Sequence, residues 1–189
     1  MEDIFYGIPE KEFAADDYEG NLRYAISQAK LDGLYMEFGV YNGRSLGIVA
    51  DAAPKDRKIY GFDSNLGLPE DWHHHPKGTF AGAMPENDRY ILVAGWFEDT
   101  LPTFEKNVVA FMHIDSDLYS SAKTIFNNFK GYIVPGTVIV FDEYHGYPTY
   151  QDHEYKAFKE FLEETGLNCR PLGVVKAQTN PSPASFIII

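Results

Sequence analysis

Short apolar runs alternate with amphipathic segments along most of the chain, and this order constrains the fold more than any other feature. Residues 108–114 and 137–141 are apolar almost without interruption, which is typical of strands buried on both faces of a sheet. Residues 118–129 instead place apolar side chains at helical spacing. Strands that alternate with helices form a parallel sheet covered on both faces. The sequence therefore predicts a doubly wound α/β fold.

Seven strands are predicted in this mostly parallel sheet, at residues 34–38, 58–62, 90–94, 108–114, 137–141, 169–175 and 185–189. Helices are predicted at residues 45–52, 98–106, 118–129 and 153–164. The length fits one domain, residues 1–189, in which residues 1–32 are expected to be a helical lead-in. Residues 64–88 form a long loop rich in Pro, Gly and His, and they are a candidate lid because loops of that length are commonly functional.

The composition limits the partners and the compartment. The 28 Asp and Glu against 16 Lys and Arg give a net charge of −12, which repels nucleic acid and anionic membranes. Cys169 is the only cysteine, so no intrachain disulfide is expected. The chain starts without a signal-peptide pattern, and no apolar run approaches the ~20 residues that span a bilayer. We expect a cytoplasmic protein without a nucleic-acid or membrane partner, and a homo-oligomer stays open.

Polar residues end several predicted strands at one edge of the sheet. Gly39, Asp63, Asp115 and the pair Asp142 and Glu143 each follow or close a strand. Ligands of open α/β sheets bind at the carboxyl ends of the strands. We therefore expect the functional site at this edge.

A glycine turn lies between the first predicted strand and its helix. Residues 37–45 carry Gly39 and Gly43, which let the backbone approach a ligand, and the helix start offers free N–H groups. Asp63 ends the next strand, where a carboxylate can meet ribose hydroxyls. The G-x-x-x-G spacing differs from the G-x-G-x-x-G of pyrophosphate binding and disfavours a nicotinamide cofactor. S-adenosylmethionine (SAM) carries no phosphate and suits the looser turn.

Four carboxylates form a second set, at Asp115, Asp117, Asp142 and Glu143. Carboxylates crowded at adjacent strand ends repel one another unless a cation or protons intervene. Oxygen ligands suit Mg²⁺ or another hard divalent cation. The alternative is that Asp117 caps the following helix and that Asp142 and Glu143 are solvated.

Two further groups of residues have side chains that could bind a ligand or take part in catalysis. Residues 73–75 are three histidines in the long loop, and adjacent residues rarely all reach one zinc ion. They are either exposed or provide one acid, base or substrate contact, for which His74 is the candidate. Trp96 and Phe97 follow the third strand and either stack on adenine or pack in the core.

Taken in order, these segments resemble the macrocin O-methyltransferase family of class I SAM-dependent enzymes. The matching stretches are residues 37–45, 62–70, 95–102, 114–120 and 135–144. The resemblance implies a Rossmann-like fold and methyl transfer from SAM to a hydroxyl of a sugar-containing or other small-molecule acceptor. The family's acidic pair is Asp-Asp, whereas this chain has Asp142 and Glu143.

The resemblance also implies roles for single residues. The candidate cofactor-binding residues are Glu37, Gly39, Tyr41, Asn42, Gly43, Ser45, Asp63, Ser64, Trp96 and Phe97. The implied metal ligands are Asp115, Asp142 and Glu143, and Asp117 or His74 is the candidate catalytic base.

Two other functions stay open. A metal-dependent glycosyltransferase also places a D-x-D motif after a strand, as in residues 115–117, but it leaves the glycine turn and Asp63 unexplained. A non-catalytic SAM-binding protein is the second alternative.

Overall fold

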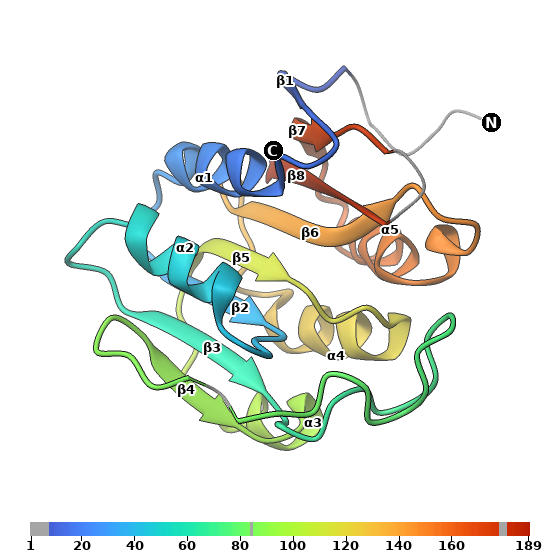
Figure 1. Cartoon of the computed structure of the whole chain (residues 1–189). Helices are drawn as coiled ribbons and strands as arrows, with labels where there is room; N and C mark the ends of the chain where they lie inside the picture. The colour runs from blue at the N-terminus through green and yellow to red at the C-terminus, as the bar shows by residue number, and fades with distance from the viewer. Residues whose placement is uncertain (1–7, 84, 178–180) are drawn as a thin grey trace.

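Eight strands form one sheet in the computed structural model, which describes residues 8–83, 85–177 and 181–189. The strands are β1 (Lys11–Phe13), β2 (Leu34–Phe38), β3 (Ile59–Asp63), β4 (Ile91–Ala94), β5 (Val109–Ile114), β6 (Val138–His145), β7 (Cys169–Val175) and β8 (Ser182–Ile188). Their order across the sheet is β1-β7-β8-β6-β5-β2-β3-β4 (Figure 1). Paired strands are parallel except where β8 runs antiparallel to β6 and β7.

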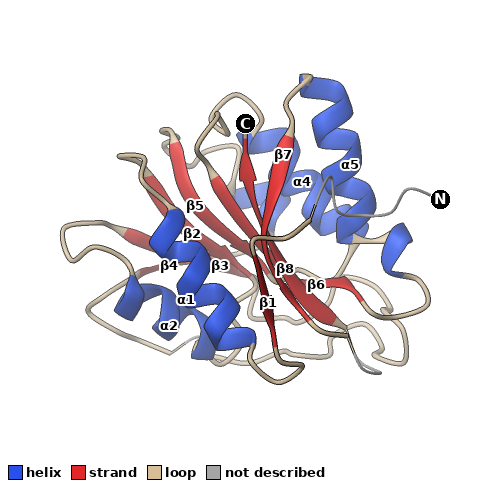
Figure 2. Ribbon diagram, turned by 90° about the horizontal axis from the view of Figure 1, so that it is seen from above, coloured by secondary structure: helices blue, strands red, loops and turns tan. Residues whose placement is uncertain are grey.

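Helices cover both faces of the sheet (Figure 2). One face carries α1 (Tyr18–Gln28) and α2 (Arg44–Ala52), and the other carries α4 (Tyr119–Phe129) and α5 (Glu154–Thr165). The short α3 (Phe97–Thr100) contacts α4, and the 3₁₀ turn η1 (Tyr150–Asp152) contacts α5. The prediction of a Rossmann-like, doubly wound α/β fold is confirmed.

The central strand β5 shows why an uninterrupted apolar run was required. Successive side chains of a strand point to opposite faces. Phe111 packs in the core beneath α1 and α2, whereas Met112 and Ile114 pack in the core beneath α4 and α5. All three side chains are fully buried, and His113 is the one polar residue of this strand, so both alternating sets are apolar at every other position.

The additional strand, β1, lies in the segment that was expected to be a purely helical lead-in. Its register pairs Lys11 with Gly173 and Phe13 with Val175 at the edge of the sheet. Lys11 and Glu12 are exposed, and Phe13 alone is buried. This strand is formed by backbone pairing with β7. It was not predicted, because a run of three residues with two charged side chains shows no apolar periodicity.

The end of one predicted helix and the predicted cap of another differ from the structure. The helix expected over residues 98–106 ends at Thr100, and Pro102 explains the early stop because proline cannot donate to the preceding turn. Leu118 is the N-cap of α4 and makes no side-chain cap bond. The alternative role of Asp117 as the helix cap is therefore wrong.

The loop over residues 64–88 has no helix or strand among its described residues, apart from an isolated bridge between Trp72 and His75. Its residues Leu68, Trp72 and Phe80 lie against the carboxyl ends of β2 and β5. Among the described residues, no helix combines the length and apolar character needed to cross a bilayer.

Candidate active site

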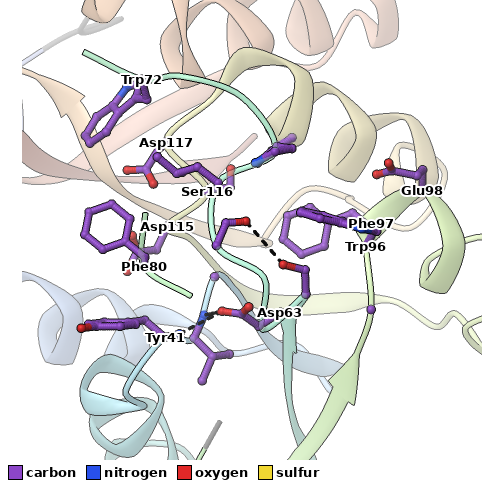
Figure 3. Close-up of a pocket in the computed structure, with 18 of the residues that line it drawn as sticks. Tyr41, Asp63, Trp72, Phe80, Trp96, Phe97, Glu98, Asp115, Ser116 and Asp117 are labelled. Carbon is purple, nitrogen blue, oxygen red and sulfur yellow. Dashed lines mark hydrogen bonds between the residues drawn. The ribbon is translucent and has the colours of Figure 1, made fainter. Parts of the chain in front are cut away.

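A cleft of about 270 Å³ opens at the carboxyl ends of the parallel strands (Figure 3). In Figure 3, Tyr41, Phe80, Trp72, Asp115 and Asp117 lie on one side, and Trp96, Phe97 and Glu98 on the other. The residues lining the cleft come from the strand ends and the long loop: Gly39, Val40, Tyr41, Asp63, Ser64, Gly67, Leu68, Pro69, Trp72, Phe80, Gly95, Trp96, Phe97, Glu98, Asp115, Ser116, Asp117, Ser121 and Glu143.

The glycine turn coils tightly against this cleft. Gly39, Tyr41 and Gly43 have φ angles of +89°, +45° and +76°, in the left-handed region that favours glycine. A Cβ on Gly39 would lie 1.8 Å from the carbonyl oxygen of Asp115, so no larger residue fits where β2 and β5 end. Of the predicted turn residues, Gly39 and Tyr41 line the cleft, whereas Asn42, Gly43 and Ser45 are not part of its lining.

Asp63 braces the turn through its carboxylate. Its Oδ2 accepts from the backbone N–H groups of Val40 and Tyr41 at 2.8 and 2.9 Å, and Oδ1 accepts from Asn65 at 2.7 Å. A carboxylate has roughly four acceptor positions. Asp63 therefore keeps acceptor capacity for a ligand hydroxyl while it fixes the strained backbone of Tyr41.

Glu37 lies beneath the cleft rather than in its wall. It is fully buried, Oε2 lies 2.8 Å from Nδ1 of His113, and Oε1 accepts from the Ser45 hydroxyl at 3.1 Å. Burial raises the pKa of Glu37. The predicted cofactor residues Glu37 and Ser45 therefore tie β2 to α2 from behind the turn.

His113 connects Glu37 to the acidic pair of β6. Its Nε2 lies 3.6 Å from Oδ1 of Asp142. Burial lowers the pKa of His113, but the neighbouring carboxyls of Asp142 and Glu37 outweigh burial and leave the pKa well above its ordinary value. A lone histidine inside the apolar run of β5 is the sequence signal for this buried link.

The predicted metal ligands are divided between two groups of side chains that share Asp115. Asp115, Asp117 and Glu143 offer oxygens that lie within 4.8 Å of one another, and His113, Asp115 and Asp142 form the other group. Asp115, Asp117 and Glu143 line the cleft, whereas Asp142 is not part of the lining.

The acidic pair does not follow β6, as predicted, but lies within it. The pairing of β6 with β5 ends at Phe141, and the pairing with β8 shifts register between Phe141 and His145. Asp142 and Glu143 occupy this irregular stretch of the strand. In a regular strand, Asp142 and Glu143 would point to opposite faces. The break in the ladders explains how each of them reaches one of the two groups that share Asp115.

The carboxyls that line the cleft are crowded and poorly solvated. Burial, with added repulsion from Asp142, raises the pKa of Asp117 to about 7 and lifts the pKa values of Asp115 and Glu143 well above their ordinary range. Glu143 Oε2 is buried without a hydrogen-bond partner. The cluster is short of positive charge, which a bound cation would supply.

Glu154 belongs to this region and was not predicted. It is fully buried in the first turn of α5, and its Oε1 accepts from the backbone N–H and the hydroxyl of Ser116 at 3.0 and 3.2 Å. Burial raises its pKa to about 8. An acidic residue on the same helical stripe as Ala157, Phe158 and Phe161 was the available sequence signal.

The predicted aromatic residues line the cleft, whereas the predicted histidine does not. Trp96 and Phe97 line the cleft together with Ser64, and Phe97 also packs edge-on against Phe38 with ring centroids 5.8 Å apart. His74 is exposed and is not among the residues that line the cleft. The side-chain placement therefore gives His74 no direct contact with this site.

An α/β sheet with a glycine turn, an acid after the second core strand and a cleft at the carboxyl edge defines a Rossmann-like cofactor-binding protein. Residues 36–144 match the family model described as "Methyltransferase domain". This match covers more than half of the chain, and the chain belongs to that methyltransferase family. The predicted membership of the class I methyltransferases is confirmed.

The chain is similar to two curated O-methyltransferases. It is 26% identical over 153 residues, 66% of this chain and 59% of the relative, to the 8-demethyl-8-(2,3-dimethoxy-alpha-L-rhamnosyl)-tetracenomycin-C 4'-O-methyltransferase of Streptomyces olivaceus. It is 25% identical over 175 residues, 76% of this chain and 67% of the relative, to the demethyldecarbamoylnovobiocin O-methyltransferase of Streptomyces niveus. The chain thus spans less than two thirds of the first relative's length.

A solved structure agrees with this family at the level of the fold. The O-methyltransferase NovP superposes with a TM-score of 0.71 at 19% identity, over 89% of this chain and 78% of that one.

Proposed function

We propose that this protein is a SAM-dependent O-methyltransferase, assisted by a divalent cation, that methylates a hydroxyl of a sugar-bearing or other small molecule. One arrangement carries the proposal: the cleft joins a cofactor-type turn to a cluster of carboxyls. The turn is braced by Asp63, and the carboxyls of Asp115, Asp117 and Glu143 line the same cleft. Family membership favours methyl transfer over the glycosyltransferase alternative.

The cofactor half of the cleft suits an adenosine moiety. Gly39 and Tyr41 give the backbone close access, and Asp63 retains an acceptor position for a ribose hydroxyl. Trp96 and Phe97 offer aromatic faces that can contact a flat purine. The remaining predicted contacts, Asn42, Gly43 and Ser45, act from behind by holding the turn and the start of α2.

The carboxyl half fits a hard divalent cation such as Mg²⁺. We assign Asp115 and Glu143 to the ion, because their carboxylate oxygens lie within 4.8 Å of one another, and Asp142 is linked to Asp115 through the second group. The buried, unpartnered Oε2 of Glu143 is the kind of atom that a cation satisfies. When bound, such a cation would lower the pKa of a hydroxyl that it contacts.

Asp117 is the residue that we assign to proton acceptance. It lines the cleft beside Asp115 and Glu143, so its carboxylate lies close to a hydroxyl bound at the cation. Methyl transfer also needs an in-line approach of the acceptor oxygen, so positioning by the cleft walls supplies much of the rate.

The acceptor is proposed from the relatives' names, which describe rhamnosyl and novobiocin-type natural products. Trp72, Phe80 and Tyr41 give the mouth of the cleft an aromatic rim that can pack against a sugar or planar ring. We further propose that the long loop 64–88 acts as a lid, that the protein has no nucleic-acid or membrane partner, and that it works in the cytoplasm.

Calorimetric titration of SAM and S-adenosylhomocysteine, with Mg²⁺ and then with EDTA, tests the cofactor. We expect micromolar binding under both conditions. Methyl transfer is then measured by mass spectrometry with a rhamnoside and a catechol as acceptors. SAM binding without transfer to any acceptor would favour a non-catalytic SAM-binding protein, and the absence of SAM binding would refute the proposal.

Asp115→Ala tests the role of the acidic cluster. We expect turnover to be abolished while SAM affinity is unchanged, because the glycine turn and Asp63 are intact in this variant. Undiminished turnover would contradict the assignment of Asp115 to the metal site.

A further inference from the structure

Glu154 is a buried carboxyl for which the proposed chemistry has no use. It is the first residue of α5, where an acid interacts favourably with the helix dipole, and it has no exposed surface although the other buried residues of this helix are apolar. Burying a carboxyl costs free energy unless its oxygens find partners. The partners of the Glu154 carboxyl therefore indicate its role.

The hydrogen bonds of Glu154 all go to one residue, among those that the structure describes. Oε1 accepts both from the Ser116 backbone N–H at 3.0 Å and from the Ser116 hydroxyl at 3.2 Å. Oε2 is buried and has no partner. The side chain is therefore held in place chiefly by its contact with Ser116.

Ser116 is the middle residue of the turn that carries Asp115 and Asp117 into the cleft. Asp117 has a φ of +61°, a left-handed conformation that is uncommon for non-glycine residues and costs backbone energy. The turn closes further through a 2.6 Å bond from the Leu118 N–H to the Ser116 carbonyl. Glu154, 38 residues away in sequence, is the side chain from outside the turn that grips its backbone.

We propose that Glu154 is a positioning residue that clamps the Ser116 backbone and thereby holds Asp117 in its strained, cleft-facing conformation. This inference rests on the proposed function, because it assigns Glu154 a role in the same reaction. The clamp needs a hydrogen-bond acceptor at Oε1 and needs neither a negative charge nor a transferable proton.

Two substitutions of similar size separate the acceptor from the charge. Glu154→Gln keeps a carbonyl oxygen for Ser116, and Glu154→Leu removes the acceptor but fills the volume. We expect Glu154→Gln to retain most of the wild-type kcat. Glu154→Leu should lose kcat by about 100-fold, the effect typical of an ångström-scale misplacement, with the SAM dissociation constant unchanged. Ser116→Ala, which removes one of the two bonds, should give a smaller loss.

Hydrogen–deuterium exchange gives a readout that does not depend on activity. The Ser116 amide should exchange slowly in the wild type and in Glu154→Gln, and faster in Glu154→Leu. A purely structural role predicts instead that kcat, SAM affinity and the melting temperature fall together in Glu154→Leu.

Three outcomes would overturn the positioning role. They are a Glu154→Gln variant as inactive as Glu154→Leu, a Glu154→Leu variant with wild-type kcat, and an unchanged Ser116 exchange rate in Glu154→Leu. If the wild type neither binds SAM nor transfers a methyl group, the proposed function fails, and the exchange rates alone still decide whether the clamp exists.

Discussion

Gly39 gives the sharpest test of the turn geometry, through the substitution Gly39→Ala. The added Cβ would lie 1.8 Å from the Asp115 carbonyl oxygen, a separation that real Cβ atoms do not reach. The obstacle is backbone at the end of β5 rather than a flexible side chain. One strand end must therefore move before an alanine can be accommodated.

The expected cost follows from two contributions. A non-glycine residue at the left-handed φ of +89° costs roughly 1–2 kcal/mol. Overpacking against a fixed neighbour adds roughly 1–3 kcal/mol. We expect a loss of ~3 kcal/mol in the free energy of unfolding, which corresponds to a fall of roughly 6–12 °C in the melting temperature of a chain of this size. SAM binding should weaken as well, because the displaced strand ends form the cleft.

Gly47→Ala is the matched control. Gly47 lies in α2, and a Cβ there meets nothing within 4 Å. Alanine is the better helix former, so this variant should be more stable by about 0.5–1 kcal/mol. Guanidinium unfolding followed by circular dichroism measures both variants. A Gly39→Ala protein within about 0.5 kcal/mol of the wild type would refute the argument from close strand approach.

Two further predictions concern titration and the histidine loop. The raised pKa values of Asp117 (about 7) and Glu154 (about 8) mean that the folded state binds these protons more tightly than the unfolded state. Their stabilising contribution is fully present below the unfolded pKa values and is lost as the pH rises through about 7 and 8. The melting temperature in EDTA should therefore fall between pH 6.5 and 8.5, and the raised pKa of His113 adds a fall of the same sign. Mg²⁺ should restore more of the melting temperature at the higher pH. A flat profile, or one that rises, would argue against the crowded acids. His74→Ala should keep the wild-type kcat in a methyl-transfer assay because His74 is exposed outside the cleft lining, and a tenfold or greater loss would return His74 to the list of candidate bases.

The sequence by itself determined the class of fold and the edge at which the site lies. Uninterrupted apolar runs mark strands buried on both faces, as in β5, and parallel strands bring their carboxyl ends together whatever their order. Gly39, Asp63 and Asp115 could therefore be assigned to one rim from their positions after strands. The apolar pattern of a strand depends only on residues that are neighbours in sequence, so it can be recognised without the structure. The edge strand β1 was missed because two of its three side chains are exposed and its pairing is made by the backbone.

Only the tertiary structure decided which side chains meet. Glu37 lies directly opposite His113 because of the register between β2 and β5, although the two are 76 positions apart in sequence. The division of the acids between two groups around Asp115 depends on where the ladders of β6 break. The clamp of Glu154 on Ser116 depends on where α5 begins, packed against α4 and β6, relative to the turn that follows β5. Register, ladder breaks and helix docking are set by the packing of the whole core. Residue types along the chain show that a carboxyl is present, and only the packed structure shows which partner it faces.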